Sequence, residues 1–181
     1  MKTLLKRKVM PLVLTMALVF LMLPISALAE DAYTYIDADG TEKSTSGPVT
    51  IIAGTGAGET LASGWYIVLA AGVTRSSTLT VNGSVHLILA DGASLIVTGS
   101  SDSAGVKVIE GKSLTIYGQA GGTGMLTANG GELGAGIGSS SGYASGTVNI
   151  HGGTVHATGG GGIGGAGIGG GYFSSGTVNI S

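Results

Sequence analysis

The hexapeptide Ser-Gly-Thr-Val-Asn-Ile occurs twice near the end of the chain, at residues 145–150 and 175–180. This repetition constrains the fold more strongly than any other feature. The tetrapeptide Ala-Gly-Ile-Gly, which begins at Ala135 and again at Ala166, recurs with almost the same spacing. Self-similarity at a period of this size is typical of chains whose successive coils stack on one another.

A third, looser match relates residues 91–97 (DGASLIV) to residues 110–116 (EGKSLTI), 19 residues later. From Pro48 onward, short runs rich in β-branched side chains alternate with Gly, Asn and Asp, and no 3.6-residue period persists. Such runs are typical of short β-strands joined by tight turns. Alternation along each strand predicts the inward-facing side chains. These are Leu79, Val81, Val85, Leu87, Leu89, Leu95, Val97, Leu114, Ile116, Val148 and Ile150.

These patterns predict an all-β solenoid over residues 48–181, in which each coil of about 19–31 residues contributes two or three strands to parallel ladders. The alternative is an antiparallel β-sandwich or meander. Asp91-Gly92 lies between two apolar runs, which is a hairpin signal when taken alone. Hairpins do not explain the repeats, so the solenoid is favoured. Glycine suits its corners, because Gly adopts positive φ and permits close backbone approach.

The first 29 residues have the three regions of a secretory signal peptide: a basic start, an uncharged apolar run over residues 9–25, and the small-x-small pattern Ala27-Leu28-Ala29. We expect cleavage after Ala29 and an extracellular or cell-envelope location. An uncleaved membrane anchor is the alternative reading. Residues 30–47 are polar and predict an N-terminal lead with one short strand near residues 33–36.

The chain from Glu30 onward keeps four basic and all ten acidic residues, a net charge of −6. This balance argues against nucleic acid or an anionic membrane as a partner, since both require clustered Lys and Arg. The chain has no Cys, so a disulfide framework is excluded.

The run from SGWYIVLAAGVTRSSTLTVNGSVHLILADGASLIV through AGIGG and GTVNIHGGTVHATGG resembles secreted, Gly-rich repeat proteins from the surface of Gram-positive bacteria. These are often described as carbohydrate-binding-domain or pectin-lyase-like β-helix proteins. The resemblance covers residues 33–181 and implies a right-handed, single-stranded parallel β-helix displayed outside the cell. Members usually continue to a wall-anchoring region, so we expect residues 48–181 to be a truncated β-helix whose last strand favours end-to-end self-association.

Two acids are candidates for catalysis. If residues 91–97 and 110–116 occupied adjacent coils, Asp91 and Glu110 would stack about 5 Å apart, the separation of a retaining glycosidase pair. Both precede a turn Gly, however, where Asp and Glu commonly close a corner. His151 and His156 flank a Gly-Gly turn but lack a third ligand, so the sequence predicts no metal site and no cofactor.

The aromatic residues point to binding. Tyr143 follows the first AGIG motif, and Tyr172-Phe173 follow the second. Exposed rings one coil apart would offer apolar faces to sugars, and outward-facing Asn149 and Asn179 would bond sugar hydroxyls. The alternative is that each ring caps the open corner of its coil. We expect Trp65 and Tyr66 to plug the first coil.

The sequence therefore predicts a secreted or cell-surface β-helical repeat protein. We expect it to be a non-catalytic module for glycan binding, adhesion or spacing, whose partner is a polysaccharide or cell-wall glycan. The alternative function is that of a polysaccharide lyase or glycoside hydrolase of the β-helix type.

Overall fold

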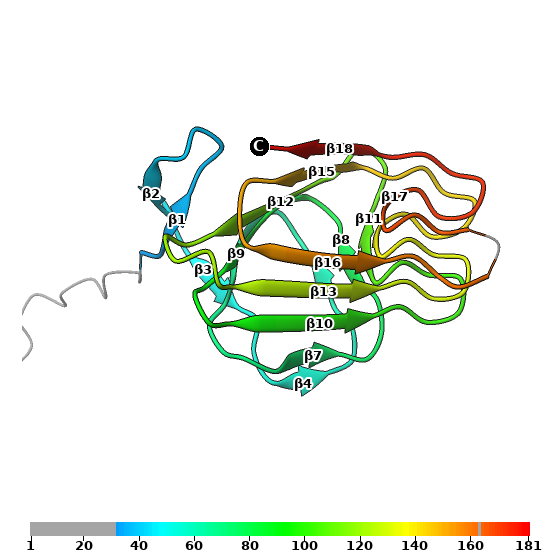
Figure 1. Ribbon diagram of the computed structural model, residues 1–181, viewed down its shortest axis with the longest axis horizontal. Coiled ribbons are helices and arrows are strands. Elements are labelled where there is room, and N and C mark those ends of the chain that lie inside the picture. The colour runs from blue at the N-terminus through cyan, green and yellow to red at the C-terminus, as the bar shows by residue number, and fades with distance from the viewer. Residues whose placement is uncertain (1–31, 163) are drawn as a thin grey trace, which may run out of the picture.

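The computed structural model describes residues 32–162 and 164–181, and within these residues the chain forms strands and no helix (Figure 1). The predicted signal peptide over residues 1–29, with Ala27 and Ala29, lies outside the described residues. The described part contains one antiparallel hairpin and three parallel sheets.

Each parallel sheet receives one strand from each successive coil of the chain, in the order sheet 1, sheet 2, sheet 3. Figure 1 shows the strands of sheet 2 stacked as successive parallel arrows. Sheet 1 contains β3 (Val49–Ile51), β6 (Gly64–Val68), β9 (Ser84–Leu89), β12 (Ser113–Gly118), β15 (Thr147–Ile150) and β18 (Thr177–Ile180). Sheet 2 contains β4 (Thr55–Gly56), β7 (Val73–Arg75), β10 (Ser94–Thr98), β13 (Met125–Asn129) and β16 (Thr154–Thr158). Sheet 3 contains β5 (Thr60–Leu61), β8 (Leu79–Val81), β11 (Val106–Val108), β14 (Ile137–Gly138) and β17 (Ile168–Gly169).

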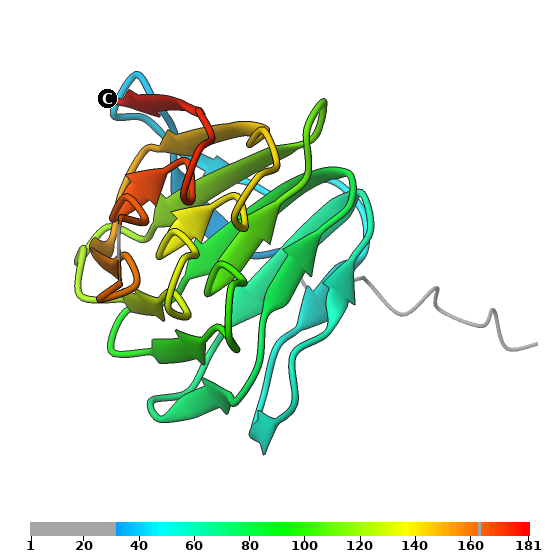
Figure 2. The same cartoon turned by 90° about the vertical axis from the view of Figure 1, so that its right-hand side faces the viewer.

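The two repeats at the end of the chain lie in register on adjacent coils. Thr147 pairs with Thr177 in sheet 1, and Ile137 pairs with Ile168 in sheet 3. The prediction that these repeats mark successive coils is therefore confirmed. Figure 2 shows the coils stacked from the cyan to the red end of the chain.

The 19-residue match has a different meaning from the one predicted. Residues 91–97 run into β10 of sheet 2, whereas residues 110–116 run into β12 of sheet 1. The match therefore relates two sides of the solenoid-like stack and does not mark the coil period. The coils also differ in length. Trp65 pairs with Val49 in the coil before and with His86 in the coil after, and these two partners lie at different distances from it along the sequence.

The core fills the space enclosed by the three sheets. All eleven predicted inward residues are buried, and most have no exposed surface at all. In sheet 1 the inward side chains form columns, for example Leu87, Ile116 and Ile150 in consecutive coils. Burying one such aliphatic side chain contributes about 1.5–3 kcal/mol, so the columns supply the main stabilisation of the stack.

The antiparallel alternative is wrong for the part of the chain from β3 onward. Asp91-Gly92 forms a corner rather than a hairpin, because it joins β9 in sheet 1 to β10 in sheet 2. The Ala93 N–H donates to the Ala90 carbonyl at 2.9 Å, and Gly92 has a φ of 75°. A positive φ at the third turn position is what Gly supplies there.

Close backbone approach explains other glycines. A Cβ built on Gly131 would lie 2.0 Å from the Ser101 carbonyl oxygen of the preceding coil. No side chain fits at that position unless the two coils separate. Gly131 is thus required by coil stacking.

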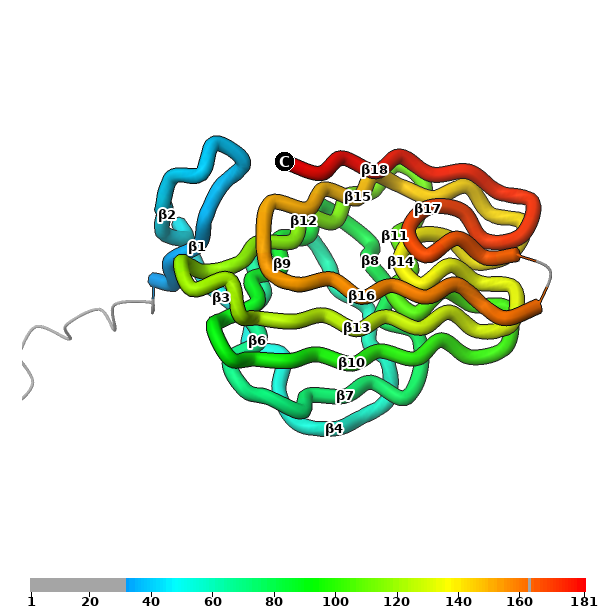
Figure 3. Tube along the Cα trace, viewed as in Figure 1, coloured from blue at the N-terminus to red at the C-terminus, as the bar shows by residue number. Residues whose placement is uncertain are grey.

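The sequence predicted only one of the two strands of the hairpin. The expected strand near residues 33–36 is β1 (Thr34–Ile36), and it pairs with a second strand, β2 (Glu42–Ser44). Figure 3 shows the hairpin beside sheet 1, and β1 packs against β12. Ile67 and Ile88 face out of sheet 1 by alternation, yet both are fully buried, because the hairpin side of the sheet is covered.

Candidate glycan-binding corner

Two adjacent corners of the stack carry the aromatic residues predicted to bind glycans. One corner joins β14 to β15 over residues 139–146, and the other joins β17 to β18 over residues 170–176. Gly142 donates its N–H to the Tyr172 carbonyl at 2.8 Å, and Ser145 donates to the Ser175 carbonyl at 2.9 Å. These bonds hold the two corners one above the other.

Two of the three predicted rings face solvent. Tyr143 is 64% exposed and Phe173 is 85% exposed. Tyr172 is half-buried, and its ring centroid lies 4.0 Å from that of Phe173. The alternative that the rings cap open corners is therefore wrong for Tyr143 and Phe173, since a cap would be buried. Each presents an aromatic face that the core does not use.

A groove of about 270 Å³ lies beside Tyr143 and is lined by Lys107, Ile109, Glu110 and Ala144 as well as by its ring. Two backbone contacts build it. Ile109 and Ser145 form an isolated antiparallel bridge, and the Gly146 N–H donates to the Val108 carbonyl at 3.0 Å. They bring the 109–112 turn of one coil against the corner of the next.

Lys107 places a positive charge over the exposed Tyr143 ring. Its Nζ lies 5.0 Å from the centroid of the Tyr143 ring, which is a cation–π distance. In the next coil, Gly138 occupies the position that pairs with Lys107. Phe173 therefore has no equivalent lysine, and the two corners differ in charge.

The two predicted asparagines lie on the outer face of sheet 1 and bond to each other. Asn179 donates from Nδ2 to the Asn149 Oδ1 at 2.8 Å, and Asn149 donates from Nδ2 to the Thr115 Oγ1 at 3.2 Å. This amide ladder holds neighbouring coils in register. Asn179 is the more exposed of the two, and its side chain is accessible to hydrogen bonds from the solvent side.

The structure does not bring Asp91 and Glu110 together. Asp91 accepts hydrogen bonds from the N–H groups of Gly121 at 2.9 Å and Thr123 at 3.1 Å, at the corner between sheets 1 and 2. These bonds, with that from Thr123 the largest influence, lower the pKa of Asp91 below its ordinary value. Glu110 lies at the corner between sheets 3 and 1, in a turn closed by a bond from the Lys112 N–H to the Ile109 carbonyl. Both acids precede a Gly of positive φ, which is the corner-closing geometry.

The histidines lie on different sheets. His151 follows β15 on sheet 1 and its Nδ1 is 2.6 Å from the Ser181 Oγ, whereas His156 lies within β16 of sheet 2. Residues 32–162 and 164–181 contain no group of three His, Cys, Asp or Glu side chains able to hold a metal ion.

An aromatic ladder on the outer face of sheet 1 was missed by the sequence prediction. Trp65 stacks on His86 with ring centroids 4.5 Å apart, and Tyr35 of the hairpin lies 4.9 Å from Trp65 and 4.6 Å from Tyr117. Trp65 therefore anchors the hairpin and does not plug the first coil. Its pairing with His86 depends on coil lengths that the sequence does not display.

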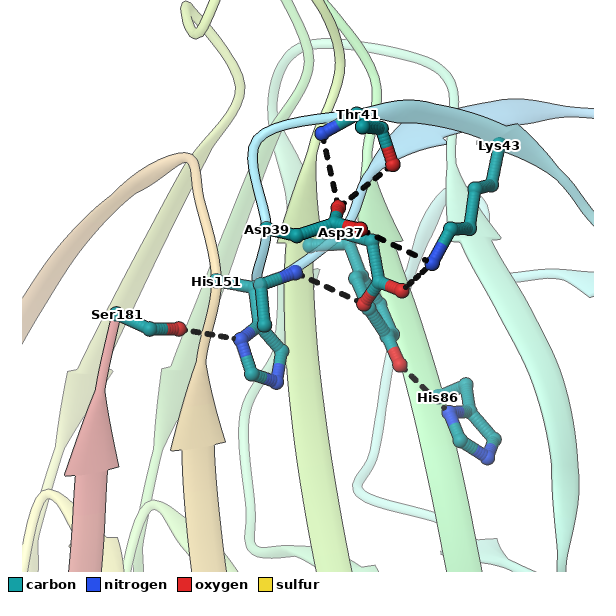
Figure 4. A network of polar contacts seen from close by, with 9 residues as sticks. Asp37, Asp39, Thr41, Lys43, His86, His151 and Ser181 are labelled. Carbon is teal, nitrogen blue, oxygen red and sulfur yellow. Dashed lines mark hydrogen bonds and ion pairs between the residues drawn. The ribbon is translucent and has the colours of Figure 1, made fainter.

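The hairpin packs against this ladder, and burial shifts the pKa values of two of its members. Burial lowers the pKa of His86 and raises the pKa of Tyr117 to about 12. The Tyr117 Oη lies 3.1 Å from the His86 Nδ1. Figure 4 shows His86 and His151 near the hairpin, in which Lys43 of β2 pairs with Asp37 of the loop. Tyr35 and Tyr117 of the ladder are buried and Trp65 and His86 are half-buried, so the ladder serves to anchor the hairpin.

Comparison with known proteins adds no relative. No protein-family model matches the chain, and neither the curated proteins nor the solved structures contain a match. Among the described residues there is no helix with the length and apolar character needed to cross a membrane.

Proposed function

We propose that the chain is a secreted or cell-surface repeat protein, folded as a right-handed single-stranded parallel β-helix, that binds glycans without catalysis and serves in adhesion or as a spacer. The observation that carries the proposal is the exposure of Tyr143 and Phe173 at equivalent corners of adjacent coils. Large exposed rings on a rigid scaffold offer apolar area that a ligand can bury.

The surroundings of the rings support a sugar as the ligand. Tyr143 borders a small groove that contains both charged and apolar groups, and the polar Asn149–Asn179 ladder lies on the adjoining sheet face. Sugars combine an apolar ring face with a rim of hydroxyls, so an aromatic ring beside hydrogen-bonding side chains suits them.

The alternative of a polysaccharide lyase or glycoside hydrolase is less well supported. Asp91 and Glu110 lie at different corners, and Asp91 is engaged by backbone N–H groups. Arg75 is buried, and it bonds to Glu59 and to the Gly54 and Thr74 carbonyls. These groups maintain corners and do not converge on a cleft.

Binding to a panel of insoluble cell-wall and plant polysaccharides tests the proposal. We expect the protein to be retained by at least one of them, and the Tyr143→Ala and Phe173→Ala variants to bind about fivefold more weakly each, about 1 kcal/mol per ring. Leu69→Ala removes an exposed apolar side chain at another corner and is the matched control. Unchanged retention of the double variant Tyr143→Ala/Phe173→Ala would contradict the proposal.

A further inference from the structure

The groove beside Tyr143 contains a ring that already holds a cation. The Lys107 ammonium lies 5.0 Å from the ring centroid, and both residues line the groove. An ammonium over the face of an exposed ring is stabilised by about 0.5–1 kcal/mol. The geometry shows that the Tyr143 ring is accessible to a primary ammonium group.

The opposite charge in the groove is unused. Glu110 lines the groove and is exposed, and none of the salt bridges among the described residues includes it. Those salt bridges join Lys43 to Asp37 and Asp39, and Arg75 to Glu59. An acidic group is therefore available to a ligand within the same groove as the aromatic face.

The net charge of the chain also favours a cationic ligand. Residues 30–181 carry ten acidic and four basic groups, so the long-range field attracts cations and repels anions. The groove, at about 270 Å³, is smaller than the roughly 300–1,000 Å³ of sites that enclose drug-sized ligands, and it suits a single sugar ring.

We propose that the glycan bound at this corner carries free amino groups, and that the ammonium of one amino sugar lodges between the Tyr143 ring and the Glu110 carboxylate. This inference rests on the proposed glycan-binding function. Lys107 competes with the sugar ammonium for the ring and repels it, so Lys107 limits the affinity. An anionic sugar would reverse both roles, with Lys107 attracting it and Glu110 repelling it.

Titration calorimetry on the full chain tests the inference with two probes of equal length, a glucosamine oligosaccharide and its fully N-acetylated counterpart. At mildly acidic pH, where the free amines are charged, we expect the glucosamine oligosaccharide to bind more tightly. Glu110→Gln should reduce this preference by up to roughly fivefold, which is the largest effect expected from the loss of an exposed ion pair. Lys107→Met should increase the preference. Glu132→Gln makes the same charge change at an exposed acid that does not line the groove and should have little effect.

The outcomes separate the two proposals. Equal or tighter binding of the acetylated probe would overturn the inference and leave glycan binding intact. The inference would also be overturned if Glu110→Gln and Glu132→Gln reduced the preference for the glucosamine oligosaccharide equally, or if Lys107→Met bound that probe more weakly. Equally tight binding of trilysine would overturn it too. Binding of neither oligosaccharide overturns it as well. In that case, retention of the protein by another polysaccharide would leave the proposed function standing.

Discussion

Asp91 shows how a single side chain closes a corner between two coils. Its carboxylate accepts from the exposed Gly121 and Thr123 N–H groups of the next coil and so ties the two bends together. The sequence predicted a corner-closing role as one of two readings. The sequence favoured the corner-closing role over catalysis, but it could not show that Asp91-Gly92 and Glu110-Gly111, which have the same local pattern, lie at two different corners.

The lowered pKa of Asp91 makes a prediction about acid stability. The folded carboxylate has a pKa below its ordinary value of 3.8, so the folded state binds fewer protons than the unfolded state. Its stabilising contribution is present above that value and is lost as pH falls through the lower folded pKa. Asp91→Asn should therefore be less stable than the wild type near neutral pH, with the difference shrinking below pH 3.8.

Chemical denaturation across this pH range measures the effect. Asp102→Asn is the control, since Asp102 is an exposed acid of another turn and accepts the Ser141 N–H through its backbone carbonyl, which the substitution keeps. If the difference in unfolding free energy between wild type and Asp91→Asn stays constant from neutral to strongly acidic pH, the stabilising role assigned to the Asp91 carboxylate is contradicted.

At the scale of elements, the hairpin was the feature hardest to predict. Tyr35 reaches Trp65 and Tyr117, which are far away in sequence and lie on separate coils. Strand alternation correctly places Ile67 and Ile88 on the outer face, where solvent exposure is the usual expectation. Only the folded hairpin reveals that this part of the face is covered.

Replacing Tyr35 tests whether the hairpin is held by its ring. Tyr35→Ala should release the hairpin and cost about 3 kcal/mol, the lower end for truncating a buried aromatic side chain. The chain has one Trp, so release should shift the emission of Trp65 to longer wavelength. Tyr143→Ala truncates an exposed Tyr and should leave the emission unchanged. A Tyr35→Ala spectrum identical to the wild type would show that other contacts hold the hairpin.

Glycine has unequal importance at different positions of the stack. Gly131→Ala should strongly destabilise the protein, because the added Cβ would lie 2.0 Å from the Ser101 carbonyl oxygen. Gly56→Ala is the matched control, since a Cβ there has no heavy atom within 4 Å and no positive φ is required. Thermal unfolding compares them. Equal melting temperatures for the two variants would mean that the coils do not approach as closely as described.

For the whole molecule, the stacked parallel sheets and the inward columns follow from the sequence. The 145–150 and 175–180 hexapeptides fix the register of the last coils, and alternation identifies residues such as Leu87 and Leu114 as core. The register of the earlier coils was not predictable, because their lengths differ and they share no exact motif. The candidate corner was found through the same repeats, whereas Lys107 and Glu110 join it only through tertiary contact.

The corner rings, the amide ladder and the hairpin anchor all depend on parallel stacking in this register. Spin labels measure it directly, because the chain has no native Cys to interfere. In sheet 2, Thr55, Thr74, Ile96, Thr127 and His156 occupy one outward column on consecutive coils. With one label at His156→Cys, we expect the distance to a second label to grow by about 4.8 Å per coil, reaching about 19 Å at Thr55→Cys. Distances that fail to increase in the order Thr127, Ile96, Thr74, Thr55 would contradict the stacked-coil architecture.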